Sequence, residues 1–284
     1  MTVRAGYDAP MYIDSHCHLS FPELLGDIDR IRLDMARARV VQAVVICTTL
    51  EEFPTVHGLA QRCPELWSTV GVHPDNEGVR EPEVSDLMER AHLPRVVAIG
   101  ETGLDYYRLA GRSIEQMHWQ RERFRVHIRA AKASSRPLVV HTRSAAEDTL
   151  RILREEGPCD AGGVFHCFTD TLETARSALD LGFDVSFSGI VSFRNAEDLR
   201  VVARFVPLER CLIETDSPYL APAPHRGKTN SPAWVPHVAE VIAQVKNLPL
   251  DIVAEATSAN ARRLFALPEV DPAPGLPGFE APAT

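Results

Sequence analysis

The sequence lacks the segments by which proteins are secreted or held in a membrane. No apolar run approaches the roughly 18 residues that a membrane span needs. The N-terminal residues show no apolar stretch of the secretory-signal type. The six cysteines are scattered without a C-x-x-C spacing, and Cys17, Cys47 and Cys211 lie in or beside apolar runs, where a reduced thiol packs as a small hydrophobic group. We therefore expect a cytoplasmic protein that does not associate with membranes.

The chain also has fewer basic than acidic residues, and few lysines. The 39 acidic residues outnumber the 30 basic ones, and the formal net charge is −9. Such a balance argues against a protein that coats nucleic acid through a broad basic face. It is compatible with local binding of a short phosphodiester, because bound divalent ions would bring positive charge to one site. Only three of the basic residues are lysines, namely Lys132, Lys228 and Lys246.

Eight short apolar runs alternate with stretches of helical spacing. The runs are Tyr12–Ser15, Ala43–Thr49, Ser68–His73, Val96–Glu101, Leu138–Thr142, Gly163–Phe168, Phe183–Ile190 and Arg210–Thr215. The helical stretches are Asp27–Arg39, Glu51–Gln61, Ile114–Ala133, Ala145–Glu155, Leu172–Leu181, Ala196–Phe205, Trp234–Lys246 and Ile252–Phe265. This alternation is typical of a parallel sheet with helical crossovers, and eight repeats predict an α/β fold, a single-domain (β/α)8 TIM barrel. No G-x-G-x-x-G follows the first run, which argues against a dinucleotide-binding sheet.

We assign residues 1–267 to the barrel. The tail from Pro268 to Thr284 holds five prolines and little periodicity, so we predict that it is disordered.

Metal-binding side chains follow five of the predicted strands. In Asp14–His18 the two histidines, His16 and His18, lie on one face because side chains alternate along a strand. The other candidates at strand ends are Glu101, His141, His166 and Asp216, with Glu214 two residues before Asp216. The carboxyl ends of barrel strands meet at one rim, where active sites lie. We therefore expect one polynuclear site for divalent ions such as Mg²⁺, Mn²⁺ or Zn²⁺.

Two divalent ions about 3.5–4 Å apart can hold both the attacking and the leaving oxygen of a displacement. Such a pair needs a bridging anion, which in some barrel hydrolases is a carbamylated lysine at a strand end. Here no lysine lies near a strand end before Lys228. A carboxylate must bridge instead, and Glu101 at the end of the fourth strand is the candidate.

These residues resemble the TatD-type metal-dependent deoxyribonucleases of the amidohydrolase superfamily, from Tyr12 to about Leu267. The motifs are D-S-H-C-H-L at Asp14–Leu19, G-V-H-P at Gly71–Pro74, G-E-T-G-L-D-Y at Gly100–Tyr106, V-H-T-R at Val140–Arg143, F-H-C-F at Phe165–Phe168, E-T-D-S-P-Y-L at Glu214–Leu220, R-G-K-x-N at Arg226–Asn230 and N-A-R-R-L-F at Asn260–Phe265.

The resemblance implies a ligand set and catalytic roles. One metal would be held by His16, His18, Glu101 and Asp216, and the other by Glu101, His141 and His166. Asp216 would also orient or deprotonate the attacking water. Glu214 would hold a third ion or contact the substrate.

Substrate contacts are expected from residues around the rim, namely His73, Arg143, Arg226, Lys228 and Asn230. In the loop Arg226–Asn230, a glycine lets the backbone approach a phosphate, and the two cations supply charge-assisted donors. The structural alternative is a solvated surface loop. Asp105 either forms a turn or supports a metal ligand, and Asp14 either orients a histidine or satisfies backbone groups.

The favoured function is hydrolysis of DNA by a 3′–5′ exodeoxyribonuclease that acts on single-stranded ends, as a monomer with no obligate protein partner. The prediction that DNA is the substrate rests on this resemblance and is supported by the Arg226–Asn230 loop. The main alternative is hydrolysis of an ester or amide at the same site, since TatD-like proteins include deacylases of D-aminoacyl-tRNA. A third alternative is a non-enzymatic binding barrel, against which the intact ligand set argues. Two or more cations at phosphate spacing on the rim would favour the nuclease, and an apolar acyl pocket would favour the deacylase.

Overall fold

The computed structural model describes residues 10–269 and contains eight parallel strands that pair in chain order. The strands are β1 (Tyr12–Cys17), β2 (Val40–Val45), β3 (Leu66–Val70), β4 (Val96–Asp105), β5 (Leu138–Arg143), β6 (Gly163–Phe165), β7 (Phe183–Phe187) and β8 (Cys211–Ile213). The ring closes where Cys17 forms a parallel bridge with Ser217 and the amide of Asp216 donates to the carbonyl of His16 at 2.9 Å. The predicted (β/α)8 barrel is confirmed.

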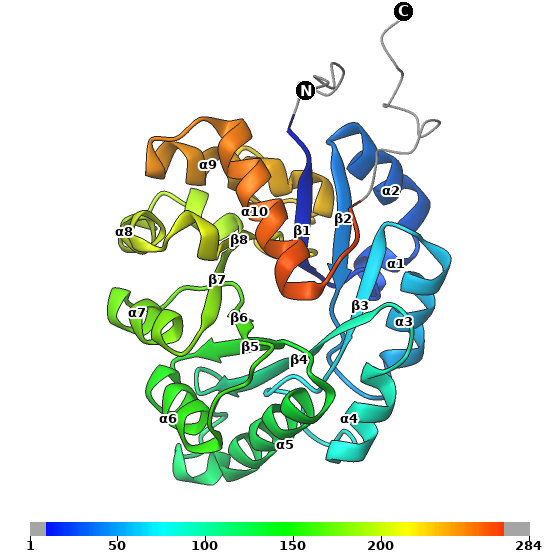
Figure 1. Ribbon diagram of the computed structural model, residues 1–284, viewed down its shortest axis with the longest axis vertical. Coiled ribbons are helices and arrows are strands. Elements are labelled where there is room, and N and C mark those ends of the chain that lie inside the picture. Colours follow the sequence, from blue (N-terminus) through cyan, green and yellow to red (C-terminus); the bar gives the residue numbers. More distant parts are fainter. Residues whose placement is uncertain (1–9, 270–284) are drawn as a thin grey trace, which may run out of the picture.

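Helices surround the strands (Figure 1). They are α1 (Pro22–Leu25), α2 (Ile28–Arg37), α3 (Phe53–Arg62), α4 (Val84–Ala91), α5 (His118–Ser134), α6 (Ala146–Glu156), α7 (Leu172–Asp180), α8 (Glu197–Phe205), α9 (Val235–Lys246) and α10 (Leu250–Phe265), with 3₁₀ turns at Glu115–Met117, Gly189–Ser192, Leu208–Arg210 and Pro232–Trp234. Helix α4, which has only eight residues, was not predicted from the sequence. Its apolar residues nevertheless have helical spacing, and a capping box between Glu83 and Asp86 starts it.

Helix α10 closes one end of the barrel. A cluster of apolar side chains there comes from the second residue of six strands, namely Ile13, Val41, Val97, Val139, Val164 and Leu212. The helix contributes Ala261, Leu264 and Phe265 to the same cluster. Figure 1 shows α10 lying across the ring of strands. The carboxyl ends of the strands therefore open at the other end.

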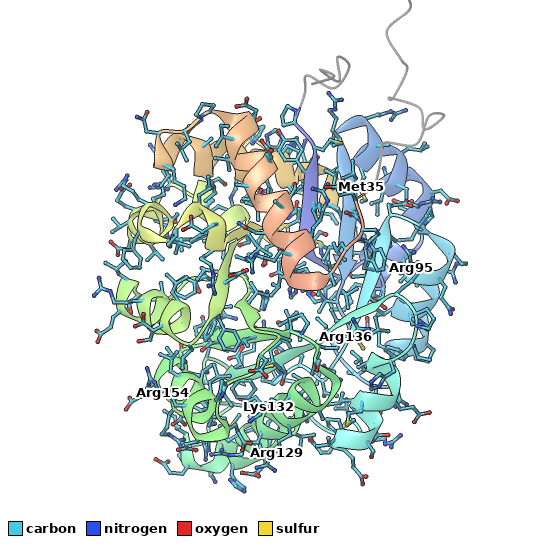
Figure 2. The ribbon with its side chains drawn as sticks, viewed as in Figure 1. Met35, Arg95, Arg129, Lys132, Arg136 and Arg154 are labelled. Atoms are coloured by element: carbon cyan, nitrogen blue, oxygen red, sulfur yellow. The ribbon has the colours of Figure 1, made fainter. Side chains whose placement is uncertain are left out.

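Basic side chains at the α10 end of the barrel are used within the protein. Figure 2 labels Arg95, which directly precedes β4, and Arg136, which lies two residues before β5. Arg95 donates to the carbonyl of Leu66 at 2.8 Å, and Arg136 donates to that of Ala91 at 3.2 Å. These arginines satisfy main-chain carbonyls and do not form a free basic face.

The residues directly after α10 contact strand β2. The carbonyl of Pro268 accepts a hydrogen bond from the Gln42 side chain at 3.3 Å. The rest of the predicted disordered tail lies outside the described residues. Among residues 10–269, no helix has the combination of length and apolar character that would let it cross a membrane.

Strand β4 carries an irregularity that places Glu101. Ile99 pairs with Leu138 and Thr102 with Val140, so two residues of β4, Gly100 and Glu101, stand opposite one residue of β5. Such a bulge re-aims a side chain. The strand then continues past its predicted end at Glu101 to Asp105, and Gly103 pairs with His141. A Cβ atom on Gly103 would lie 1.9 Å from the carbonyl oxygen of His141, and the residue has φ +137°, so only glycine fits.

We expect Gly103→Ala to destabilise the protein by about 3 kcal/mol or more, because it adds both a backbone clash and an unfavourable φ. Denaturant unfolding measures the change. Gly26→Ala is the control, since Gly26 has φ −70° and a Cβ there meets nothing within 4 Å. It should shift stability by less than about 0.5 kcal/mol. Equal unfolding midpoints for the two variants would contradict the close β4–β5 contact.

Candidate metal centre

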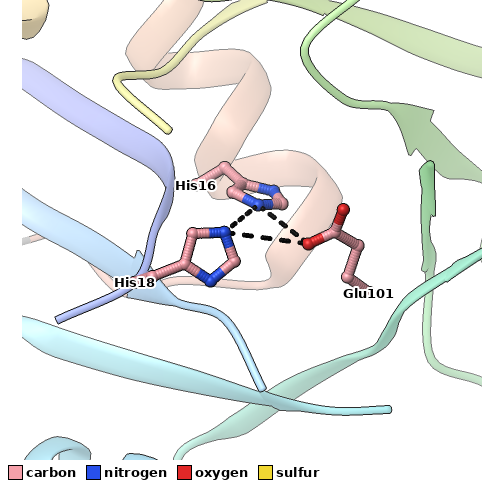
Figure 3. Close-up of side chains that lie close together, drawn as sticks. All are labelled: His16, His18 and Glu101. Atoms are coloured by element: carbon pink, nitrogen blue, oxygen red, sulfur yellow. Dashed lines mark hydrogen bonds and ion pairs between the residues drawn. The ribbon is translucent and has the colours of Figure 1, made fainter. Parts of the chain in front are cut away.

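The two carboxylate oxygens of Glu101 face two different groups of histidines. Oε2 lies 3.3 Å from Nε2 of His16 and 3.8 Å from Nε2 of His18, and those two nitrogens are 3.2 Å apart (Figure 3). Asp216 Oδ1 completes this first group at 3.2 Å from His18 Nε2 and 3.6 Å from His16 Nε2. The first predicted ligand set is thus brought together around one oxygen of Glu101.

The second group surrounds Oε1 of Glu101. His166 Nε2 lies at 2.7 Å, His141 Nδ1 at 3.0 Å and His73 Nε2 at 3.2 Å from this oxygen. His141 and His166 were predicted from the sequence as members of this second group, whereas His73 was predicted to contact the substrate. The structure places the His73 ring beside His141, with Nε2 and Nδ1 3.3 Å apart.

Each histidine of the second group has a carboxylate at its far nitrogen. Asp105 Oδ2 lies 3.2 Å from His141 Nε2, Glu214 Oε1 lies 3.3 Å from His166 Nδ1, and Asp75 contacts His73 Nδ1. Because an ionised carboxylate can only accept hydrogen bonds, the far nitrogen carries the proton and donates a hydrogen bond to it. The near nitrogen of the neutral ring then presents a lone pair to Glu101. Carboxylates orient metal-ligating histidines in this way.

The structure shows the contacts of two acidic residues whose roles the sequence left open. Asp105 forms a turn, because Oδ1 accepts from the amides of Tyr107 at 2.9 Å and Arg108 at 3.3 Å, while its Oδ2 faces His141. Asp14 satisfies backbone groups, accepting from the amides of His16 at 3.2 Å and Thr215 at 2.9 Å. Burial of Asp14 raises its pKa to about 8.

Glu214 is fully buried beside His166, behind the pocket. His16, His166 and Glu214 each offer one ligand atom within 4.8 Å of the others, so the predicted third-ion role keeps a structural basis. In the structure Glu214 contacts Nδ1 of His166 and thereby orients that ring.

The electrostatics of the site favour bound positive charge. Burial alone would raise the pKa of Glu101, but the charges of His166, His73 and His16 outweigh it and hold that pKa well below its usual value. Burial would likewise lower the pKa of His73, yet Glu101 and Asp75 raise it to about 10. Glu101 likewise outweighs burial at His166 and raises its pKa, and a metal ion would compete with the protons of His73 and His166 for the same nitrogens.

The residues fit a pair of divalent cations. Lone pairs of neutral imidazoles directed at a carboxylate oxygen repel it unless a second proton or a cation lies between them. Among residues 10–269, Nδ1 of His16, Nδ1 of His18 and Oε2 of Glu214 are buried without a hydrogen-bond partner. The mixed nitrogen and oxygen donors suit zinc, manganese or magnesium.

Helix α5 holds the loop that carries His73. Arg123, almost fully buried, donates from Nη1 to the carbonyls of His73 and Asn76, both at 2.8 Å. The amide of Val72 donates to Nε2 of His127 at 2.9 Å. These contacts fix a loop that extends from the end of β3, so that His73 reaches Glu101.

A pocket of about 560 Å³ opens over the metal centre. Of the predicted substrate residues, His73 and Arg143 line it. Arg226 and Lys228 face solvent, and the Arg226 guanidinium lies 3.4 Å from the centre of the Phe193 ring. Asn230 is fully buried and its amide donates to the carbonyls of Thr215 at 2.9 Å and Tyr219 at 2.7 Å, so it shapes the loop after β8.

Several residues that line the pocket were given no role from the sequence, among them Asp75, Arg108 and Tyr219. Asp75 stands two residues after His73 in a loop, where no strand or helix periodicity indicates which side chains face inward. Proximity to His73 in the sequence was the available signal.

Comparison with known proteins supports a metal-dependent hydrolase. Residues 13–266 match the family model described as "TatD related DNase". The chain is 47% identical over 257 residues to YcfH of Escherichia coli K12, named an uncharacterized metal-dependent hydrolase, covering 89% of this chain and 95% of that protein. It is 39% identical to a Mycobacterium tuberculosis protein, named an uncharacterized metal-dependent hydrolase TatD, over 90% and 98% of the two chains.

Structural similarity agrees with the sequence matches. The crystal structure of the TatD homologue YJJV from E. coli K12 superposes with a TM-score of 0.84 at 28% identity, covering 90% of this chain and 98% of that chain. A TatD family hydrolase from Entamoeba histolytica, at 23% identity and a TM-score of 0.76, shows the same fold.

We expect Glu101→Gln to lose at least one bound metal ion per chain, because an amide nitrogen replaces one of the two oxygens that face the histidine groups. Metal analysis of protein purified without chelator measures this. Glu89→Gln, at an exposed position of α4, is the control and should keep the wild-type metal content. Two ions per chain in Glu101→Gln would exclude a bridging role.

We expect Asp105→Asn to weaken metal binding about 10–100-fold, as changes in residues that orient metal ligands do. An amide facing His141 Nε2 favours the tautomer whose proton sits on Nδ1, where the metal would bind. Titration with Mn²⁺ measures the affinity. Asp148→Asn is the matched control, since Asp148 bonds to the Tyr106 hydroxyl at 2.7 Å outside the pocket. Equal affinities in the two variants would contradict the orienting role.

Proposed function

The chain belongs to the TatD-related DNase family of metal-dependent hydrolases, and on this basis we propose that it hydrolyses phosphodiester bonds in DNA with two divalent metal ions. We propose further that it acts as a 3′–5′ exonuclease on single-stranded ends. The observation that carries the two-ion proposal is the division of Glu101, with one oxygen facing His16 and His18 and the other facing His73, His141 and His166.

The residues divide between the two ions as the two groups do. His16, His18 and Asp216 with Glu101 Oε2 would hold one ion, and His141 and His166 with Glu101 Oε1 would hold the other. His73 joins the second group or donates to a substrate oxygen there. When bound, such a pair supplies Lewis-acid activation of the attacking water and of the phosphodiester.

In this proposal Asp216 takes the proton from water. Burial raises the pKa of Asp216, but the hydrogen bond from His18 and the charge of His16 outweigh burial and hold the pKa below its usual value. The carboxylate is thus ionised at neutral pH. Its side chain lines the pocket, so it can reach a substrate-side water.

The depth of the site supports a single-stranded end as substrate. The side chains of His16 and Glu101 are only 1% and 3% exposed, so a scissile phosphate must enter the pocket to reach them. A flexible unpaired end can enter more readily than a phosphate within a rigid duplex.

We expect wild-type protein with Mg²⁺ or Mn²⁺ to shorten a 5′-labelled single-stranded oligonucleotide from its 3′ end in single-nucleotide steps, and chelator to stop it. Asp216→Asn should reduce the rate at least about 100-fold, the scale of general-base loss. Asp29→Asn is the control, because that side chain is 97% exposed on α2. Its rate should equal the wild-type rate.

Other outcomes identify the alternatives. Internal fragments in place of a ladder would show an endonuclease. If metal-loaded protein leaves DNA intact, the nuclease proposal fails, and D-aminoacyl-tRNA is the next substrate to assay. Protein that retains less than one ion per chain would support the non-enzymatic barrel.

A further inference from the structure

We propose that the mouth of the pocket is a nucleotide subsite, in which Arg108 and Arg143 bind a phosphate next to the scissile one and Tyr219 stacks on an unpaired base. This subsite rests on the proposed nuclease function. It assigns strand recognition to the loops after β4 and β5 and to Tyr219 in the loop after β8, and not to Arg226–Asn230 further along that last loop.

The two arginines supply the positive charge of the mouth. Among the described residues 10–269, Arg108 and Arg143 are the only lysine or arginine side chains that line the pocket. They leave neighbouring strands, since Asp105 pairs with Arg143 in the β4–β5 ladder and the amide of Tyr106 donates to the Arg143 carbonyl at 2.9 Å. Two guanidinium groups on adjacent strand ends suit a phosphate, to which arginine donates charge-assisted hydrogen bonds.

Each arginine is held in place yet open to a ligand. The Arg143 guanidinium lies 3.8 Å from the centre of the Tyr107 ring, a cation–π contact that leaves its N–H edges free. Arg108 pairs with Asp75 at 3.2 Å while 66% of its side chain remains exposed. A phosphate can therefore join or replace Asp75 on Arg108.

Asp105 connects this subsite to the metal centre. One of its oxygens contacts the metal-facing His141, and the other accepts from the amides of Tyr107 and Arg108. This carboxylate thus ties the backbone of Arg108 and of Tyr107, on whose ring Arg143 packs, to the second histidine group. A phosphate bound at the arginines sets which neighbouring phosphate reaches the metals.

Tyr219 provides an aromatic face in the loop after β8. The side chain is 52% exposed, packs edge-on against Phe21 at 6.2 Å between ring centres, and lines the pocket. Its amide donates to the carbonyl of Asp216 at 3.0 Å, which ties the ring to a metal-facing residue. Tyr219 and Arg108 thus line the same pocket. Exposed aromatic rings beside cationic groups are typical of single-strand binding.

The arginines are tested with two substrates. We expect Arg108→Gln and Arg143→Gln each to lower kcat/KM about tenfold or more on a single-stranded oligonucleotide. Hydrolysis of bis(p-nitrophenyl) phosphate, a diester with no neighbouring phosphate, should stay at the wild-type rate. Each variant should also reduce the slope of log kcat/KM against log salt concentration by about 0.7, the value for one phosphate contact on a single strand.

Arg112→Gln is the matched control. Arg112 lies in the same loop as Arg108 but pairs with Glu77 outside the pocket. This variant should match wild type on both substrates.

The outcomes separate the two proposals. If wild-type protein hydrolyses neither substrate, the nuclease function fails. If wild type degrades the oligonucleotide and the two arginine variants do so equally well, the subsite is wrong and the function stands. An equal loss on both substrates would also overturn the subsite, because the arginines would then act through the metal centre.

Tyr219 is tested by ring removal. We expect Tyr219→Leu to lower kcat/KM about fivefold or more on the oligonucleotide, and Tyr219→Phe to restore it, since stacking needs the ring and not the hydroxyl. On an oligonucleotide whose terminal nucleotides are abasic, Tyr219→Leu should equal wild type. The same loss on the abasic strand would contradict base stacking.

Discussion

The structure depends on one buried carboxylate that serves two groups of imidazoles. Glu101 is 2% exposed, and five histidine nitrogens lie within 3.8 Å of its two oxygens. A buried carboxylate is costly unless positive charge compensates it. Protons on the histidines or cations between them provide that charge, and the chain offers no lysine nearby. The polar interior at this end of the barrel is therefore stable only where protonated histidines or bound cations compensate Glu101.

The barrel supplies the geometry for this carboxylate. Helix α10 and the first residues of the strands form an apolar plug at one end of the barrel. The histidines and carboxylates around Glu101 lie at the other end. The β4 bulge points Glu101 inward, and Gly103 lets β4 approach β5 closely enough for Asp105 to reach His141. Stability and chemistry are therefore divided between the two ends, as in other barrels of this type.

Much of this was predictable from the sequence. Apolar runs in the sequence predict the strands, and a parallel barrel brings the carboxyl ends of its strands together. The residues that follow those runs could therefore be placed at one rim, namely His16, His18, Glu101, His141, His166 and Asp216. The absence of lysine near those ends indicated a bridging glutamate. Substrate class came from resemblance to a family and not from local pattern.

The residues whose contacts the sequence did not predict lie in loops. His73 reaches Glu101 only because α5 holds its loop through Arg123 and His127, a contact between segments about 50 residues apart. Asn230 follows a glycine-containing basic stretch and looks like a ligand residue, yet its amide is used inside the loop. Periodicity carries no information about such side chains, since their direction is decided by tertiary contacts.

Anomalous diffraction from crystals soaked in Mn²⁺ is the most direct test of the two-ion centre. We expect two peaks about 3.5–4 Å apart, the separation of paired catalytic ions. One should be bound by Glu101 Oε2 with His16 and His18, and the other by Glu101 Oε1 with His141 and His166. A single peak, or two peaks that do not share Glu101, would contradict the bridging role on which the proposed chemistry depends.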